Sequence, residues 1–109
     1  MKINYEDFRK VKIHVGTVKT VEENKRARKP ALALEIDFGS GIGMKKTSAQ
    51  ITDYYNENNL LGKQVIAICN FPAKNIAGLE SEVLVLGAVE EDSKVVLVHP
   101  SKKWQMDWK

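Results

Sequence analysis

Cationic side chains occur in three separate stretches of this 109-residue sequence. The first stretch is a polar segment near residue 25, the second is a pair of lysines, and the third is one lysine beside an asparagine. Lysine and arginine bind the phosphates of a nucleic-acid backbone, and such contacts carry little base specificity. If folding brings the three stretches to one face, that face is predicted to bind RNA. The candidate residues are Lys25, Arg26, Arg28, Lys29, Lys45, Lys46 and Lys74.

A loop between two apolar segments, residues 70–86, adds polar groups to these cations. Gly78 permits a positive φ, so the loop is expected to adopt a defined shape between its flanking strands. The floor of an RNA-binding pocket is predicted to contain Asn70, Ser81 and Glu82, because an amide, a hydroxyl and a carboxylate can contact a base edge or a ribose. The alternative is that Ser81 and Glu82 form a turn that ties its own backbone.

Residue types that perform catalysis are sparse in the sequence. His14 lies in an apolar strand pattern and His99 stands beside a proline, and neither has a nucleophile or carboxylate at an interpretable spacing. The single cysteine, Cys69, lies in an apolar run and is expected to be a small core residue. Metal-ligand pairs, a phosphate-binding P-loop and a Gly-rich dinucleotide turn are not found. The sequence therefore predicts a binding protein without a cofactor or metal, and not an enzyme.

The charges are distributed unevenly along the chain. Residues 1–46 contain eleven Lys and Arg against six Asp and Glu, whereas residues 47–109 contain six against eight. This asymmetry indicates an anionic partner on one side of the molecule, although a solvated face explains a small excess almost as well. The length predicts one domain over residues 1–109. The absence of an apolar leader and of a long apolar run predicts a cytoplasmic protein that does not insert into a membrane.

Alternating apolar residues predict an all-β protein. The regular alternation of residues 32–38 is the clearest strand pattern, and the change of phase at Gly16 predicts a bulge in a long, bent first strand. Pro30 ends a loop that precedes the second strand. The predicted strands are residues 10–21, 32–38, 42–48, 64–70 and 82–89, with an additional apolar strand at residues 94–98.

One helix is predicted between the third and fourth strands. Thr47 and Gln50 have the spacing of a capping box, and Ile51, Tyr54 and Tyr55 have the spacing of one helical face, which predicts a helix over residues 49–55. Three strands, a helix and two strands are the element order of a five-stranded Greek-key barrel, the OB-fold. Meander sheets and SH3-like barrels remain alternatives.

Several joined motifs resemble the tRNA-binding domain family. The segments are SAQIT from Ser48, LG at Leu61, and GLESEVLVLG from Gly78. The segments DFRKVKIHVGTV, RKPALALEIDFG and VIAICNFP are similar to the CsaA-type branch of that family, the export-related chaperones. Many tRNA-binding relatives have Ser-Glu-Gly-Met where this chain has SEVL from Ser81, and loss of that glycine favours the chaperone branch.

The resemblance implies an OB barrel that acts as a homodimer. It also implies binding of tRNA and, for the chaperone branch, binding of unfolded or pre-export polypeptides with links to the secretion machinery. We expect a chaperone of this kind, and the alternative is a free-standing or synthetase-associated tRNA-binding module. Sequence alone leaves open whether the two ligands share one surface.

The C-terminal segment offers residues for a dimer interface. A sixth apolar strand has no place in a five-stranded barrel, and an uncovered strand promotes aggregation. Pairing across a two-fold axis would cover that strand with aromatic residues from either end of the chain. The predicted interface residues are Phe8, Val95, Val96, Leu97, Val98 and Trp104, with Trp108 as a further candidate. The alternative is that the two tryptophans cap the end of the barrel.

Overall fold

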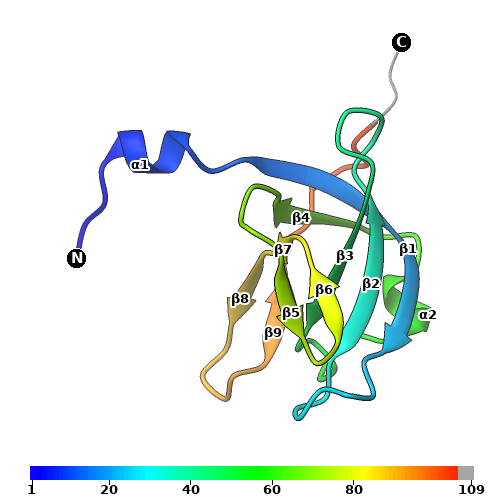
Figure 1. Cartoon of the computed structure of the whole chain (residues 1–109). Helices are drawn as coiled ribbons and strands as arrows, with labels where there is room; N and C mark the ends of the chain where they lie inside the picture. The colour runs from blue at the N-terminus through cyan, green and yellow to red at the C-terminus, as the bar shows by residue number, and fades with distance from the viewer. Residues whose placement is uncertain (106–109) are drawn as a thin grey trace.

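The structure is a computed structural model that describes residues 1–105 (Figure 1). This part of the chain contains two short helices and nine strands. The helices are α1 (Tyr5–Arg9) and α2 (Glu57–Leu60). The strands are β1 (Ile13–Glu23), β2 (Leu32–Asp37), β3 (Met44–Ala49), β4 (Gln64–Ile68), β5 (Lys74–Ile76), β6 (Leu79–Ser81), β7 (Leu84–Val85), β8 (Gly87–Val89) and β9 (Val95–Leu97).

The main sheet has the strand order β3-β2-β1-β4-β7, with antiparallel pairing throughout. The long strand β1 pairs with β4 through its first half and with β2 through its second half. Because one strand belongs to both halves, the sheet curves around on itself (Figure 1). The register of β1 shifts between Val18 and Thr20. The sequence predicted the bulge at Gly16, and the structure has it a few residues later, between Val18 and Thr20.

The barrel closes where β3 meets the segment that follows β6. The amide of Glu82 donates to the carbonyl of Lys46 at 2.8 Å. The Thr47 hydroxyl donates to the carbonyl of Val83 at 2.8 Å and lies 2.9 Å from the hydroxyl of Ser81. These contacts give a nearly closed five-stranded antiparallel barrel with a helix between β3 and β4. The predicted OB-fold is confirmed.

The core fills this barrel with alternate residues of the strands. Leu34 and Ile36 of β2 are almost completely buried, as are Val18 of β1 and Val65 of β4. Leu60 of α2 is 2% exposed and belongs to the same cluster. The short helix therefore fills the barrel interior with a single large side chain.

The helix begins later than the sequence predicted. Asn56 caps α2, and its side chain and that of Asn59 form a reciprocal capping box. Thr47, the predicted cap, lies inside β3, where its hydroxyl is used in closing the barrel. Ile51 nevertheless packs into the core, and Tyr55 packs against it. The prediction of a helix over residues 49–55 was thus wrong, although two of the residues predicted to face the core, Ile51 and Tyr55, do so.

The segment predicted as one loop followed by one strand is divided into four short strands. β5 and β6 form a hairpin, and its turn contains Ala77 and Gly78, both with positive φ. The predicted strand over residues 82–89 is divided into β7 and β8. β9, the additional strand, pairs with β8 in the same chain. It therefore has a partner without a second copy, which corrects the expectation of an uncovered strand.

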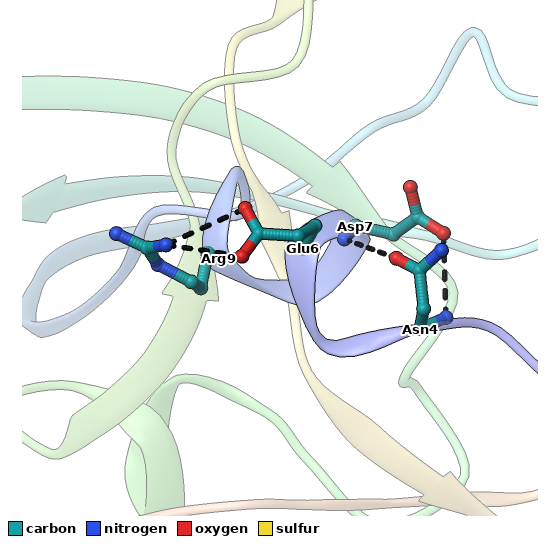
Figure 2. Close-up of polar contacts among 4 residues, drawn as sticks. All are labelled: Asn4, Glu6, Asp7 and Arg9. Atoms are coloured by element: carbon teal, nitrogen blue, oxygen red, sulfur yellow. Dashed lines mark hydrogen bonds and ion pairs between the residues drawn. The ribbon is translucent and has the colours of Figure 1, made fainter.

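Helix α1 stands away from the barrel at the end of an N-terminal arm (Figure 1). Asn4 caps the helix by accepting from the amide of Asp7 at 3.0 Å, and Arg9 forms an ion pair with Glu6 at 3.2 Å (Figure 2). None of the helix residues is buried. Local capping contacts therefore hold this helix, because it has little packing of its own.

We predict that Gly16→Ala destabilises the barrel. A methyl group at Gly16 would collide with Cγ2 of Ile36 and lie 2.7 Å from Cε1 of Phe38, and both side chains are buried. Overpacking of this kind costs about 1–3 kcal/mol, which urea unfolding would measure as a lower free energy of unfolding.

Gly41→Ala is the matched control. Nothing lies within 4 Å of the added carbon there, and Gly41 has no positive φ. We expect the control to unfold at the wild-type urea concentration or slightly above it. Equal stabilities of the two variants would contradict the proposed packing at Gly16.

Candidate nucleic-acid and polypeptide surfaces

The loop between β1 and β2 lies against the β5–β6 hairpin. The side-chain amide of Asn24 donates to the hydroxyl of Ser48 at 3.1 Å and to the carbonyl of Ile76 at 3.4 Å. The guanidinium of Arg26 lies over Gly78, so close that a Cβ atom there would be 2.7 Å from Cζ of the arginine. Two segments about fifty residues apart in sequence thus become neighbours. We call their cations, Lys25, Arg26, Arg28, Lys29 and Lys74, the cationic rim.

The two lysines of β3 point to opposite sides of the sheet, because successive residues of a strand alternate. Lys46 pairs with Glu35 of β2 on the outer face. Lys45 pairs with the buried Ile36 in register, and its ammonium lies 3.9 Å from Glu82. The outer face near Lys46 carries the acids Glu35 and Asp37. Lys46 therefore shares this face with two acids, whereas the rim cations lie in the β1–β2 loop and the hairpin.

The three residues predicted for the pocket floor all hydrogen-bond to backbone. Asn70 accepts from the amide of Lys12 at 2.9 Å and donates to the carbonyl of Lys10 at 2.7 Å. Ser81 is 8% exposed and accepts from the amide of Ser48 at 3.2 Å.

Glu82 has the same kind of role, because it accepts from the amide of Lys46 at 3.0 Å. Ser81 and Glu82 thus tie the neighbouring strand rather than their own turn. Asn70 anchors the chain just before β1. These side chains shape the surface around the rim, and their polar atoms already have protein partners.

Within residues 1–105, the titratable groups show no arrangement for nucleophilic chemistry. Burial raises the pKa of the Cys69 thiol, and the charge of Lys45 offsets this only in part. The hydrogen bond from Tyr54 to Glu90 raises the pKa of that tyrosine to about 12. His14 and His99 are exposed. Within residues 1–105, no three His, Cys, Asp or Glu side chains are grouped to hold a metal ion.

An apolar groove lies between the β5–β6 hairpin and strands β7 to β9, and Lys74 of the cationic rim is also among its lining residues. Its volume is about 770 Å³. Three large apolar side chains in it are half exposed or more: Phe71 at 52%, Leu84 at 50% and Val89 at 68%. This groove was not predicted from the sequence. The sequence does contain apolar residues at both ends of the 70–86 segment, Phe71 and Leu84. The β5–β6 hairpin between them, which forms one wall of the groove, was not predicted.

The residues predicted for a dimer interface differ in exposure. Leu97 is buried in the core, and Val95 packs against it. Phe8, Val96, Val98 and Trp104 are exposed. Trp108 lies outside the described residues. None of the described helices is long and apolar enough to cross a membrane.

Comparison with known proteins agrees with this geometry. The family model described as "Putative tRNA binding domain" matches residues 13–106. The chain belongs to the tRNA-binding domain family. The matched residues include all strands of the barrel described above. The members of this family are binding domains and not catalytic domains.

Similar solved structures include two of CsaA chaperones. The CsaA structure from Bacillus anthracis str. Ames is 50% identical, with a TM-score of 0.91 over 97% of this chain and 96% of that one. The CsaA structure from Picrophilus torridus is 48% identical, with a TM-score of 0.89 over 97% of both chains. The predicted resemblance to CsaA-type proteins is confirmed.

The chain is also similar to part of a much longer enzyme. It is 36% identical over 99 residues to the methionine–tRNA ligase of Porphyromonas gingivalis, which is 91% of this chain but 14% of that protein. The chain therefore spans 14% of the length of this curated relative. The match covers the tRNA-binding domain and not the catalytic part of the ligase.

Proposed function

We propose that the protein is a chaperone that binds unfolded or pre-export polypeptides in the apolar groove. The groove is the observation that carries the proposal. Contiguous exposed apolar surface is uncommon on a soluble protein and marks interaction sites. Phe71, Leu84 and Val89 provide such a surface. A groove of about 770 Å³ accommodates a few side chains of an extended segment.

The likeness to two CsaA chaperones over nearly the full length of each chain supports the same function. In this proposal the protein acts in the cytoplasm and holds its clients before export, so the secretion machinery is the expected recipient. The cationic rim at the edge of the hairpin disfavours strongly basic clients.

We predict that Leu84→Ser weakens client binding. Leu84 is half exposed in the groove, and the loss of about 1.5 kcal/mol of apolar contact corresponds to roughly a tenfold lower affinity. The measurement is the molar excess of protein needed to suppress aggregation of a denatured client, followed by light scattering.

Leu61→Ser is the matched control for this experiment. Leu61 has a similar exposure, 46% against 50%, and lies outside the groove. The control should suppress aggregation as the wild type does. Loss of suppression in both variants, or in neither, would contradict a client site in the groove.

We also propose that the protein acts as a homodimer. The N-terminal arm carries Ile3, Tyr5 and Phe8, each at least half exposed, and α1 has no buried residue. The exposed Val96 and Val98 supply apolar surface near the C-terminus. An arm that projects from its own barrel is suited to pack on a second copy.

A dimer predicts a mass of twice 12.3 kDa in size-exclusion chromatography with light scattering. Phe8→Ser should shift the protein toward the monomer, because the arm loses its large apolar anchor. Phe71→Ser is the control, since its exposure of 52% matches the 51% of Phe8. A wild-type protein that elutes as a monomer at micromolar concentration would exclude the dimer.

RNA binding is a second candidate function, and the contact of Arg26 with Gly78 favours it. That contact joins the β1–β2 loop to the hairpin and so concentrates cations at one end of the barrel. In OB-folds, the corresponding two loops flank the surface that binds oligonucleotides. The proposed ligand is tRNA, with the rim cations holding phosphates around the hairpin. The proposed phosphate contacts are Arg26, Arg28, Lys29 and Lys74. The other candidate residues, Lys45, Lys46, Asn70, Ser81 and Glu82, are proposed to shape the surface beside them.

We predict that tRNA affinity falls steeply with salt. Each phosphate contact contributes about one unit to the log–log slope, so Arg28→Ala and Lys74→Ala should each lower the slope by about one. Lys94→Ala is the control, because Lys94 already pairs with Asp92 at 3.3 Å. A salt-independent affinity, or wild-type slopes in both rim variants, would rule out the proposed contacts.

A further inference from the structure

The segment that follows β9 returns to the body of the barrel. The side-chain amide of Gln64 in β4 donates to the carbonyl of Trp104 at 2.8 Å and accepts from its amide at 2.7 Å. The glutamine thus makes the two hydrogen bonds that a neighbouring strand would make. We call residues 98–105 the C-terminal strap.

A hollow of about 960 Å³ lies between the strap, β1 and the turn before β4. Four lysines and one histidine line it, and they come from three segments far apart in sequence: Lys19, Lys63, His99, Lys102 and Lys103. In the part of the chain that the structure describes, no Asp or Glu lines this hollow. We call it the strap hollow.

The charge of the strap hollow is large for this protein. Its four lysines exceed the net charge of +3 that the whole chain carries. Within residues 1–105, none of the four forms an ion pair, whereas Lys45 and Lys94 both do. Like charges brought together without counter-charges repel one another, so the site gains stability from an anion.

We propose that the strap hollow is a second RNA contact that binds backbone phosphates, an inference that rests on the RNA-binding function proposed above. The lysines are exposed point charges from separate segments, and such groups bind a phosphate backbone without reading sequence. A small phosphorylated ligand would instead need several convergent polar groups in an enclosed pocket.

Trp104 adds a second feature that suits RNA. Its side chain is 54% exposed, while its backbone is fixed by Gln64. Exposed aromatic rings beside lysines provide stacking surfaces for unpaired bases. A fixed backbone lowers the entropy lost when the ring stacks on a base.

The strap hollow and the cationic rim are joined by β1. Lys19 lies five residues before the start of the rim loop, which is about 17 Å along an extended strand. One folded RNA can therefore contact both surfaces. The acids Glu35 and Asp37 on the intervening outer face favour contact at these two ends rather than across the middle of the sheet.

The test measures tRNA affinity across a salt series for three full-length proteins. These are the wild type, a double variant that combines Lys63→Ala with Lys102→Ala, and Lys94→Ala as the charge control. The double variant should lower the log–log slope by about two units, and the control should leave it unchanged. Thermal unfolding of each variant confirms that the affinities compare folded proteins.

A second readout uses fluorescence. Trp108→Phe leaves Trp104 as the single tryptophan of the chain, which contains two. Addition of tRNA should change the emission of Trp104, and the double lysine variant should reduce that change.

The outcomes separate the two proposals. A wild type that does not bind tRNA would overturn both. Weaker tRNA binding by Arg28→Ala and Lys74→Ala, combined with a wild-type salt slope in the double lysine variant, would overturn only the proposal for the strap hollow. A response of Trp104 to ATP alone at micromolar concentration, with no response to tRNA, would also overturn it, because the hollow would then be a mononucleotide site.

Discussion

The hydroxyl of Thr47 makes the contact on which the remaining structure depends. It donates to the carbonyl of Val83 and lies in hydrogen-bond contact with Ser81, and both hydroxyl-bearing residues are buried. Buried polar groups are costly unless paired, so this arrangement fixes the segment after β6 against β3. Closing the barrel removes the free edge of β3, which would otherwise pair with other chains. The same contact fixes the end of the β5–β6 hairpin, since Ser81 is the last residue of β6.

The hairpin then divides the surface into two chemically different regions. Its tip meets Arg26 and completes the cationic rim, while its base forms one wall of the apolar groove. The two regions adjoin, because Lys74 belongs to the rim and also lines the groove.

The sequence predicted the barrel well where alternation was strong. The residues of β2 alternate strictly, and the structure buries Leu32, Leu34 and Ile36 in turn. Prediction failed where a polar residue had two possible partners. Thr47 fits a helix cap locally, but a buried carbonyl across the barrel takes its hydroxyl. The placement of the candidate residues was predicted in part: the rim loop and the hairpin do meet, whereas Lys45 and Lys46 diverge because register decides which side of a strand faces outward.

The sequence by itself determined the class of fold, the family and the types of side chain available for binding. These depend on local periodicity and on motifs that lie within a few residues of one another. Only the tertiary structure decided which distant residues adjoin: Arg26 with Gly78, Gln64 with Trp104, and the lysines of the strap hollow. The reason is that long-range contacts follow from barrel closure, which is a property of the whole chain and leaves no pattern in any one segment.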